Sequence, residues 1–173
     1  MRVVFLGDSH LARVRRDLPV VGPDVCNAAE GGASALDVLA QATRVAVQDS
    51  DLAVLSVGTN DAAPWKQVPM TVFGRAVAQC LESVPARRWI YVAPPGVDEA
   101  RLTGSGDRTN AILDAYRDAA LSVCGDAGAG VVRTERVIAP LGAAAFVDDG
   151  LHLSGPAYKL VLRAIADAVH AKW

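Results

Sequence analysis

Cysteine, aromatic side chains and excess positive charge are all scarce in this chain of 173 residues. Its three cysteines are an odd number without C-x-x-C spacing, so we expect buried free thiols rather than disulfides or metal ligands. Aromatic residues make up 5% of the chain. The formal net charge is −2, which leaves no basic excess to neutralise phosphates, and no nucleic-acid partner is expected.

Long apolar runs and several well-known motifs are also missing. No run approaches the ~18 apolar residues that a membrane span needs, and the apolar start is too short for a signal peptide. If Met1 is the native start, we expect a cytoplasmic location. The G-x-S-x-G, G-x-G-x-x-G and G-x-x-x-x-G-K-[ST] patterns are absent, which argues against an ordinary α/β-hydrolase, a dinucleotide site and a P-loop. No metal or other cofactor is expected.

Short apolar runs alternate with amphipathic segments along the whole chain. Runs at 1–6, 51–57, 88–93 and 130–133, with a very short one at 25–27, predict strands that are buried on both faces. Helical periodicity predicts helices over 33–48, 68–83 and 107–123, and a last helix that Ser154 caps with Pro156 in its first turn. This alternation predicts one domain over 1–173, an α/β/α three-layer, flavodoxin-like sandwich with about five parallel strands.

Ligand sites in such sheets lie beyond the carboxyl ends of the strands, and four polar clusters fall there or beside the last helix. They are the Gly-Asp-Ser turn at 7–9, the segment 27–32 with its paired glycines, the Gly-Thr-Asn-Asp segment at 58–61, and the Asp-Gly-Leu-His segment at 149–152. We expect all four to converge on one edge of the sheet.

These residues have the chemistry of acyl transfer. A serine hydroxyl needs a base to remove its proton, and His152 can act as that base for Ser9. Asp149, three residues earlier, is spaced to orient the ring; Asp148 is the rival, one residue further away. Donors for a developing oxyanion are available from the Asn60 amide and the backbone N–H groups of Gly32 and Ser9.

Together, the four clusters resemble the sequence blocks of the SGNH hydrolase superfamily, the GDSL-like lipases and esterases. They stand in the family's order, and the resemblance implies Ser9 as nucleophile, His152 as base and Asp149 as acid. It also implies Gly32 and Asn60 as oxyanion donors; because two glycines are adjacent, Gly31 is the alternative to Gly32. The chain departs from the pattern at position 10, where histidine replaces the family's leucine.

The expected activity is therefore serine-dependent hydrolysis of a carboxylic ester with a small or short acyl group, such as an O-acetyl on a sugar or small metabolite. Three alternatives stay open. The first is a hydrolase that acts on thioesters or on longer acyl chains, as in lysophospholipids. The second is an acyltransferase with the same triad, and the third is a non-catalytic binding module. Trp65, Met70 and the loop at 94–106 are candidates to border the substrate pocket, or else to pack on the core. No apolar stripe marks an interface, so the oligomeric state is not predicted.

Overall fold

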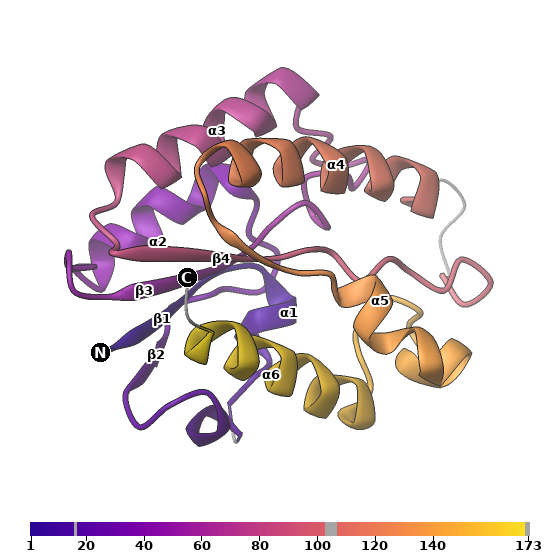
Figure 1. Ribbon diagram of the computed structural model, residues 1–173. Helices are drawn as coiled ribbons and strands as arrows, with labels where there is room; N and C mark the ends of the chain where they lie inside the picture. Colours follow the sequence, from indigo (N-terminus) through magenta and orange to yellow (C-terminus); the bar gives the residue numbers. More distant parts are fainter. Residues whose placement is uncertain (16, 103–106, 172–173) are drawn as a thin grey trace.

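Five parallel strands form one sheet in the order β2-β1-β3-β4-β5 (Figure 1). The computed structural model describes residues 1–15, 17–102 and 107–171. The strands are β1 (Val3–Gly7), β2 (Val25–Asn27), β3 (Leu52–Ser56), β4 (Arg88–Val92) and β5 (Gly130–Val132). This strand order is that of flavodoxin-like sandwiches, and the predicted fold is confirmed.

Both faces of the central strands are buried, as their apolar sequences require. Alternate residues of β1 point to opposite faces: Val4 and Leu6 belong to one hydrophobic core, Val3 and Phe5 to the other. All four are at most 2% exposed. The sheet therefore divides the molecule into two apolar layers, each of which needs a covering layer of helices.

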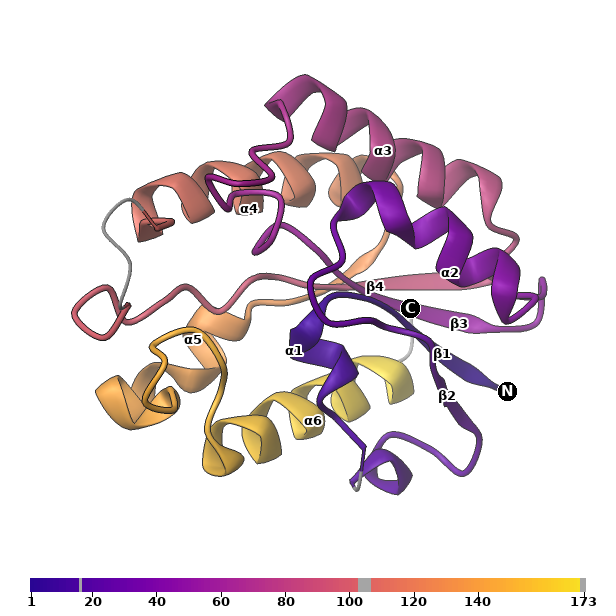
Figure 2. The same cartoon turned by 180° about the vertical axis from the view of Figure 1, so that it is seen from behind.

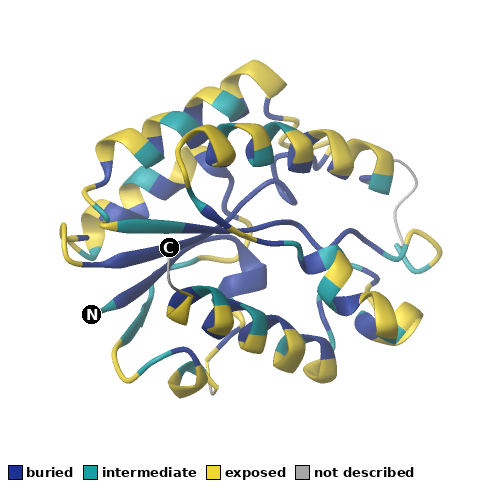
Figure 3. Cartoon of the chain, in the orientation of Figure 1, coloured by how far each residue is buried: buried dark blue, intermediate teal, exposed yellow. Residues whose placement is uncertain are grey.

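Helices cover the two faces in separate groups (Figures 1 and 2). One face carries α2 (Val38–Arg44), α3 (Met70–Ser83) and α4 (Asn110–Asp126), and the other carries α1 (Ser9–Ala12), α5 (Thr134–Ile138) and α6 (Gly155–His170). Short 3₁₀ turns are η1 (Leu18–Val20), η2 (Ala35–Asp37) and η3 (Ala139–Ala145). Figure 3 shows buried residues on the inner sides of the helices and exposed residues on their outer sides.

Most element boundaries lie within a few residues of the predicted ones. The Ser154 hydroxyl caps α6, as predicted, by accepting a hydrogen bond from the Ala157 N–H. The helix expected over 33–48 is shorter, since it consists of η2 followed by α2. The helix α5 was not predicted from the sequence.

The structure also shows the state of the three cysteines. Cys80 and Cys124 are buried, Cys26 is half-buried, and all three are free. Within the described residues, no helix is both long and apolar enough to cross a membrane. The same part of the chain holds no group of three or more His, Cys, Asp and Glu side chains arranged to bind a metal ion.

Candidate active site

The turn at residues 7–9 carries Ser9 from the end of β1 into the first position of α1. Gly7 has a φ of 122°, and a Cβ at this position would lie 1.9 Å from the Ser56 carbonyl oxygen, so no other residue fits. The Asp8 carboxylate caps α1 by accepting the His10 N–H at 3.0 Å. The serine is thus held by a backbone that is packed against the neighbouring strand.

Gln41 fixes the same turn from the layer of helices above it. Its side-chain oxygen accepts the Gly7 N–H at 2.6 Å, and its amide nitrogen donates to the Gly7 carbonyl at 2.9 Å. The side chain is 1% exposed. Sequence reasoning missed this residue, although a glutamine beside the buried Val38 and Ala42 of α2 was the available signal.

Replacing Gln41 with leucine should therefore loosen the turn that holds Ser9. Leucine has a similar volume but leaves the buried Gly7 N–H without its acceptor, which costs about 1–3 kcal/mol of unfolding free energy. We expect that loss in urea unfolding, with lower esterase activity. Thr43→Ala, at an exposed position on the same helix, is the matched control. Equal stability of the Gln41 variant and the wild-type protein would contradict this role.

Ser9, His152 and Asp149 form a hydrogen-bonded chain. His152 Nε2 lies 3.1 Å from Ser9 Oγ, and His152 Nδ1 lies 2.6 Å from Asp149 Oδ2. The other carboxylate oxygen of Asp149 accepts the backbone N–H groups of Leu151 and His152 at 2.9 and 2.8 Å. The structure thus brings together the three residues that the sequence proposed, and Asp149 rather than Asp148 contacts the ring.

The Asp149 carboxylate is ionised and sets the tautomer of the imidazole. Partial burial acts to raise its pKa, but hydrogen bonds from the His152 ring, the His152 N–H and the Leu151 N–H outweigh burial and lower the pKa to about 2. An ionised carboxylate only accepts hydrogen bonds, so Nδ1 of the neutral ring carries the proton. Nε2 is then an acceptor that faces the Ser9 hydroxyl.

Asn60 follows β3 and presents its side-chain amide beside the 31–33 segment. One amide N–H donates to the Ala33 carbonyl at 2.9 Å, which fixes the plane of the amide and leaves the second N–H for another acceptor. The N–H groups of Ser9, Gly31 and Gly32 have no protein acceptor among the described residues. Fixed donors without partners are what an oxyanion requires.

Asp61 connects the segment before α2 with the segment after β3. This fully buried carboxylate accepts the Ala35 N–H and the Gly58 N–H, each at 2.9 Å. Burial raises its pKa, while these backbone hydrogen bonds act to lower it. Asp61 therefore links the segment before α2 to the segment after β3, and positions Asn60 relative to Gly32.

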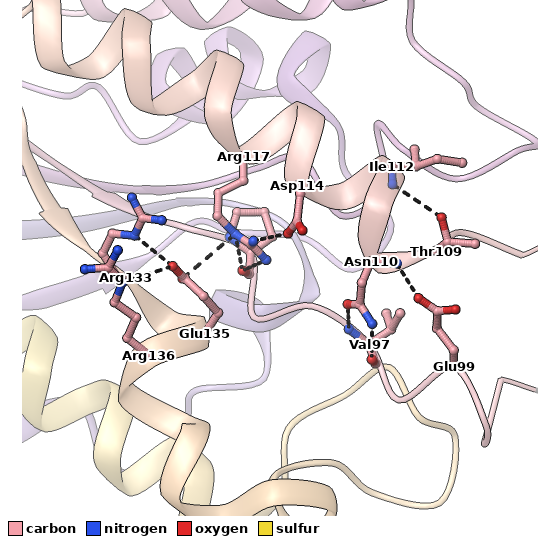
Figure 4. A network of polar contacts seen from close by, with 11 residues as sticks. Val97, Glu99, Thr109, Asn110, Ile112, Asp114, Arg117, Arg133, Glu135 and Arg136 are labelled. Atoms are coloured by element: carbon pink, nitrogen blue, oxygen red, sulfur yellow. Dashed lines mark hydrogen bonds and ion pairs between the residues drawn. The ribbon is translucent and has the colours of Figure 1, made fainter.

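The segment that follows β4 supports the loop of Asp149 and His152. Figure 4 shows its anchors: Arg117 of α4 donates to the Pro94 carbonyl at 2.9 and 3.1 Å, and Asn110 exchanges two hydrogen bonds with Val97. The Asp98 N–H then donates to the Gly150 carbonyl at 2.7 Å. A Cβ at Gly150, where φ is 69°, would lie 2.6 Å from the Asp98 carbonyl oxygen, so the close contact requires glycine.

Two buried titratable side chains flank Ser9. Burial raises the pKa of Asp8 to about 7, and burial, helped by nearby His152 and Arg108, lowers the pKa of His10 to about 3. The His10 ring lies 6.2 Å from the His152 ring, and neither of its nitrogens has a hydrogen-bond partner. His10, the departure from the family's leucine, is therefore a buried side chain whose lowered pKa keeps the ring neutral.

His10 should make the protein sensitive to acid. The native state keeps this ring neutral, whereas the unfolded chain binds a proton below its pKa of about 6.5. Its contribution to stability is complete above that pH and is lost as the pH falls towards about 3. When the pH is lowered from about 7.5 to about 4.5, the unfolding free energy of the wild type should fall. The unfolding free energy of His10→Leu should fall by about 2–3 kcal/mol less.

Urea unfolding at the two pH values measures this difference. Asp8, the other buried titratable group, is present in both proteins, so its titration contributes to both measurements. His170→Gln, at an exposed position, is the control and should behave like the wild type. A parallel loss of stability in the wild type and His10→Leu would contradict a buried neutral His10.

Comparison with known proteins places this arrangement in a class. The GDSL-like Lipase/Acylhydrolase family model matches residues 5–160. The lipase/acylhydrolase from Enterococcus faecalis has a similar structure, with a TM-score of 0.81 and 21% identity over 96% of this chain and 94% of that one. An acetylxylan esterase from Geobacillus stearothermophilus gives a TM-score of 0.75 and 16% identity over 99% and 95%. No curated protein matches significantly in sequence.

The fold and the family match define a serine ester hydrolase on a flavodoxin-like sandwich. The chain belongs to the GDSL-like lipase/acylhydrolase family, as its four sequence blocks predicted. At 16–21% identity, the structural neighbours support the fold and leave the substrate to be argued from the site.

Proposed function

We propose that Ser9, His152 and Asp149 are a catalytic triad that hydrolyses O-acyl esters with short acyl groups, above all acetyl esters. The observation that carries the proposal is the continuous chain of contacts from Ser9 Oγ to His152 Nε2 at 3.1 Å and from His152 Nδ1 to Asp149 Oδ2 at 2.6 Å. A nucleophile, a base and an orienting carboxylate in that order activate a serine hydroxyl.

The reaction takes two acyl-transfer steps. Ser9 Oγ attacks the ester carbonyl carbon while its proton moves to His152 Nε2, and the oxyanion is held by Asn60 and the N–H groups of Gly32 and Ser9. Collapse of this intermediate breaks the bond to the alcohol, which leaves with the proton from His152. Water then attacks the acyl-enzyme with His152 again as base, which releases the carboxylic acid and restores Ser9.

A short acyl group fits the open surroundings of the proposed oxyanion donors. Gly31 and Gly32 are exposed, and a Cβ built at either position meets no atom within 4 Å. A long acyl chain gains binding energy by burying its methylene groups, which an open surface does not provide. The neighbouring structure of an acetylxylan esterase is consistent with acetyl as the acyl group.

Rates on p-nitrophenyl acetate, butyrate and octanoate test the proposal. We expect kcat/KM to be highest for acetate and to fall with each longer chain. A value that rises towards octanoate would contradict the short-chain assignment and favour a hydrolase of long acyl chains. Product analysis with added alcohols distinguishes hydrolysis, which yields acetic acid, from transfer, which yields a new ester.

A further inference from the structure

Trp65 exposes a large aromatic surface beside the site, although the chain has few aromatic residues. It is 67% exposed, so it does not pack into the core. One face of its ring is covered by the Arg108 guanidinium, whose central carbon lies 4.9 Å from the ring centroid. The indole is therefore supported from one side, while much of its surface faces solvent.

The support beneath the ring is rigid. Arg108 is 2% exposed, and its guanidinium donates to the Asp107 carboxylate and to the Thr59 carbonyl, each at 2.9 Å. A buried cation held by two acceptors keeps one orientation, and the ring stacked on it loses little further freedom when a ligand binds. Trp65 thus has the properties of a preformed platform.

The platform adjoins both segments that supply the proposed oxyanion donors. Thr59, which Arg108 contacts, directly precedes Asn60. Lys66, which directly follows Trp65, donates from Nζ to the Gly32 carbonyl at 2.6 Å. Arg108 also acts electrostatically on Asp8 and His10, the two neighbours of Ser9. A substrate whose carbonyl oxygen is held by Asn60 and Gly32 therefore has Trp65 next to it.

We propose that Trp65 is a subsite for a sugar ring in the alcohol portion of the ester, so that the substrate class is O-acetylated carbohydrate. This inference rests on the proposed function. The C–H face of a pyranose stacks on an open indole, and the charged Lys66, Asp37 and Asp107 around the platform can hydrogen-bond to hydroxyl groups. An acyl chain would instead need an enclosed apolar groove.

The test compares acetyl esters of a ring and of an acyclic alcohol. Acetylated methyl β-xyloside and butyl acetate carry the same acyl group, so their ratio of kcat/KM reports on the alcohol subsite alone. Trp65→Ala should lower this ratio about tenfold, and Trp65→Phe, which keeps an aromatic face, should lower it less. Leu160→Ala, a truncation of a side chain exposed on α6, should leave the ratio as in the wild type. An equal loss of both activities in Trp65→Ala would overturn the proposal and make Trp65 a structural residue.

Binding to an inactive protein separates the subsite from the reaction. Calorimetric titration of acetylated methyl β-xyloside into Ser9→Ala should show binding that weakens about tenfold in the Ser9→Ala, Trp65→Ala double variant. If butyl acetate is hydrolysed but Ser9→Ala does not bind the xyloside, the subsite is wrong and the esterase proposal stands. If neither ester is hydrolysed but Trp65-dependent binding persists, the subsite stands and the proposed reaction fails.

Discussion

Replacement of Ser9 by alanine should lower kcat for p-nitrophenyl acetate by about 10⁴-fold or more, to a residual rate supported only by substrate binding and the oxyanion donors. The variant lacks the oxygen that attacks the carbonyl carbon, and His152 Nε2 loses the hydroxyl that lies 3.1 Å away. The proposed backbone donors remain in place, because alanine keeps the N–H group of residue 9.

The fold should survive this substitution. Among the described residues, Ser9 Oγ makes a hydrogen bond only with His152, and alanine is a good helix former at the start of α1. Circular dichroism and urea unfolding should match the wild type, and Ser83→Ala, an exposed serine at the end of α3, is the control for activity. Full esterase activity in folded Ser9→Ala would exclude Ser9 as the nucleophile.

Asp149→Asn should have the second-largest effect, a loss of about 10³–10⁴-fold in kcat. Asparagine can keep the two backbone hydrogen bonds that Asp149 Oδ1 accepts, so the loop should hold its shape. An amide N–H turned towards the ring would favour the tautomer with its proton on Nε2, which cannot accept the Ser9 proton. The carboxylate charge that stabilises the imidazolium would also be lost.

Asp148→Asn is a closely matched control, because this exposed aspartate is the adjacent residue and undergoes the same chemical change. It should retain the wild-type rate on p-nitrophenyl acetate. If Asp148→Asn instead loses activity while Asp149→Asn keeps it, the roles of the two aspartates are reversed. Unfolding curves of both variants verify that the comparison concerns chemistry and not folding.

The sheet could be predicted because each of its central strands carries its own signal. Apolar residues on both faces of 51–57 and 88–93 indicate buried parallel strands, and β3 and β4 lie there. The early end of α2 had no such signal. Arg2, far away in the sequence, donates to the carbonyls of Val45 and Ala46 and pairs with Asp51, while Ala46 has a φ of 48°.

The sequence could also predict which segments of the chain meet at the candidate site. Its four clusters are local in the sequence, and parallel strands place their carboxyl ends at one edge. Gln41 and Arg108 contact that edge through side chains from other elements, at sequence separations of 34 and 49 residues. Helical periodicity can mark Gln41 as a polar residue on a buried helix face, but it does not identify the distant partner that either side chain contacts, which only the folded arrangement reveals.

Covalent labelling with a fluorophosphonate tests the assignment of the nucleophile most directly. The reagent phosphonylates an activated serine, and mass spectrometry of the digested protein locates the adduct. The triad predicts one adduct per chain, on Ser9, with labelling lost in Ser9→Ala and strongly slowed in His152→Ala. An adduct on a different residue, or unlabelled Ser9 in a protein that hydrolyses p-nitrophenyl acetate, would contradict the proposed mechanism.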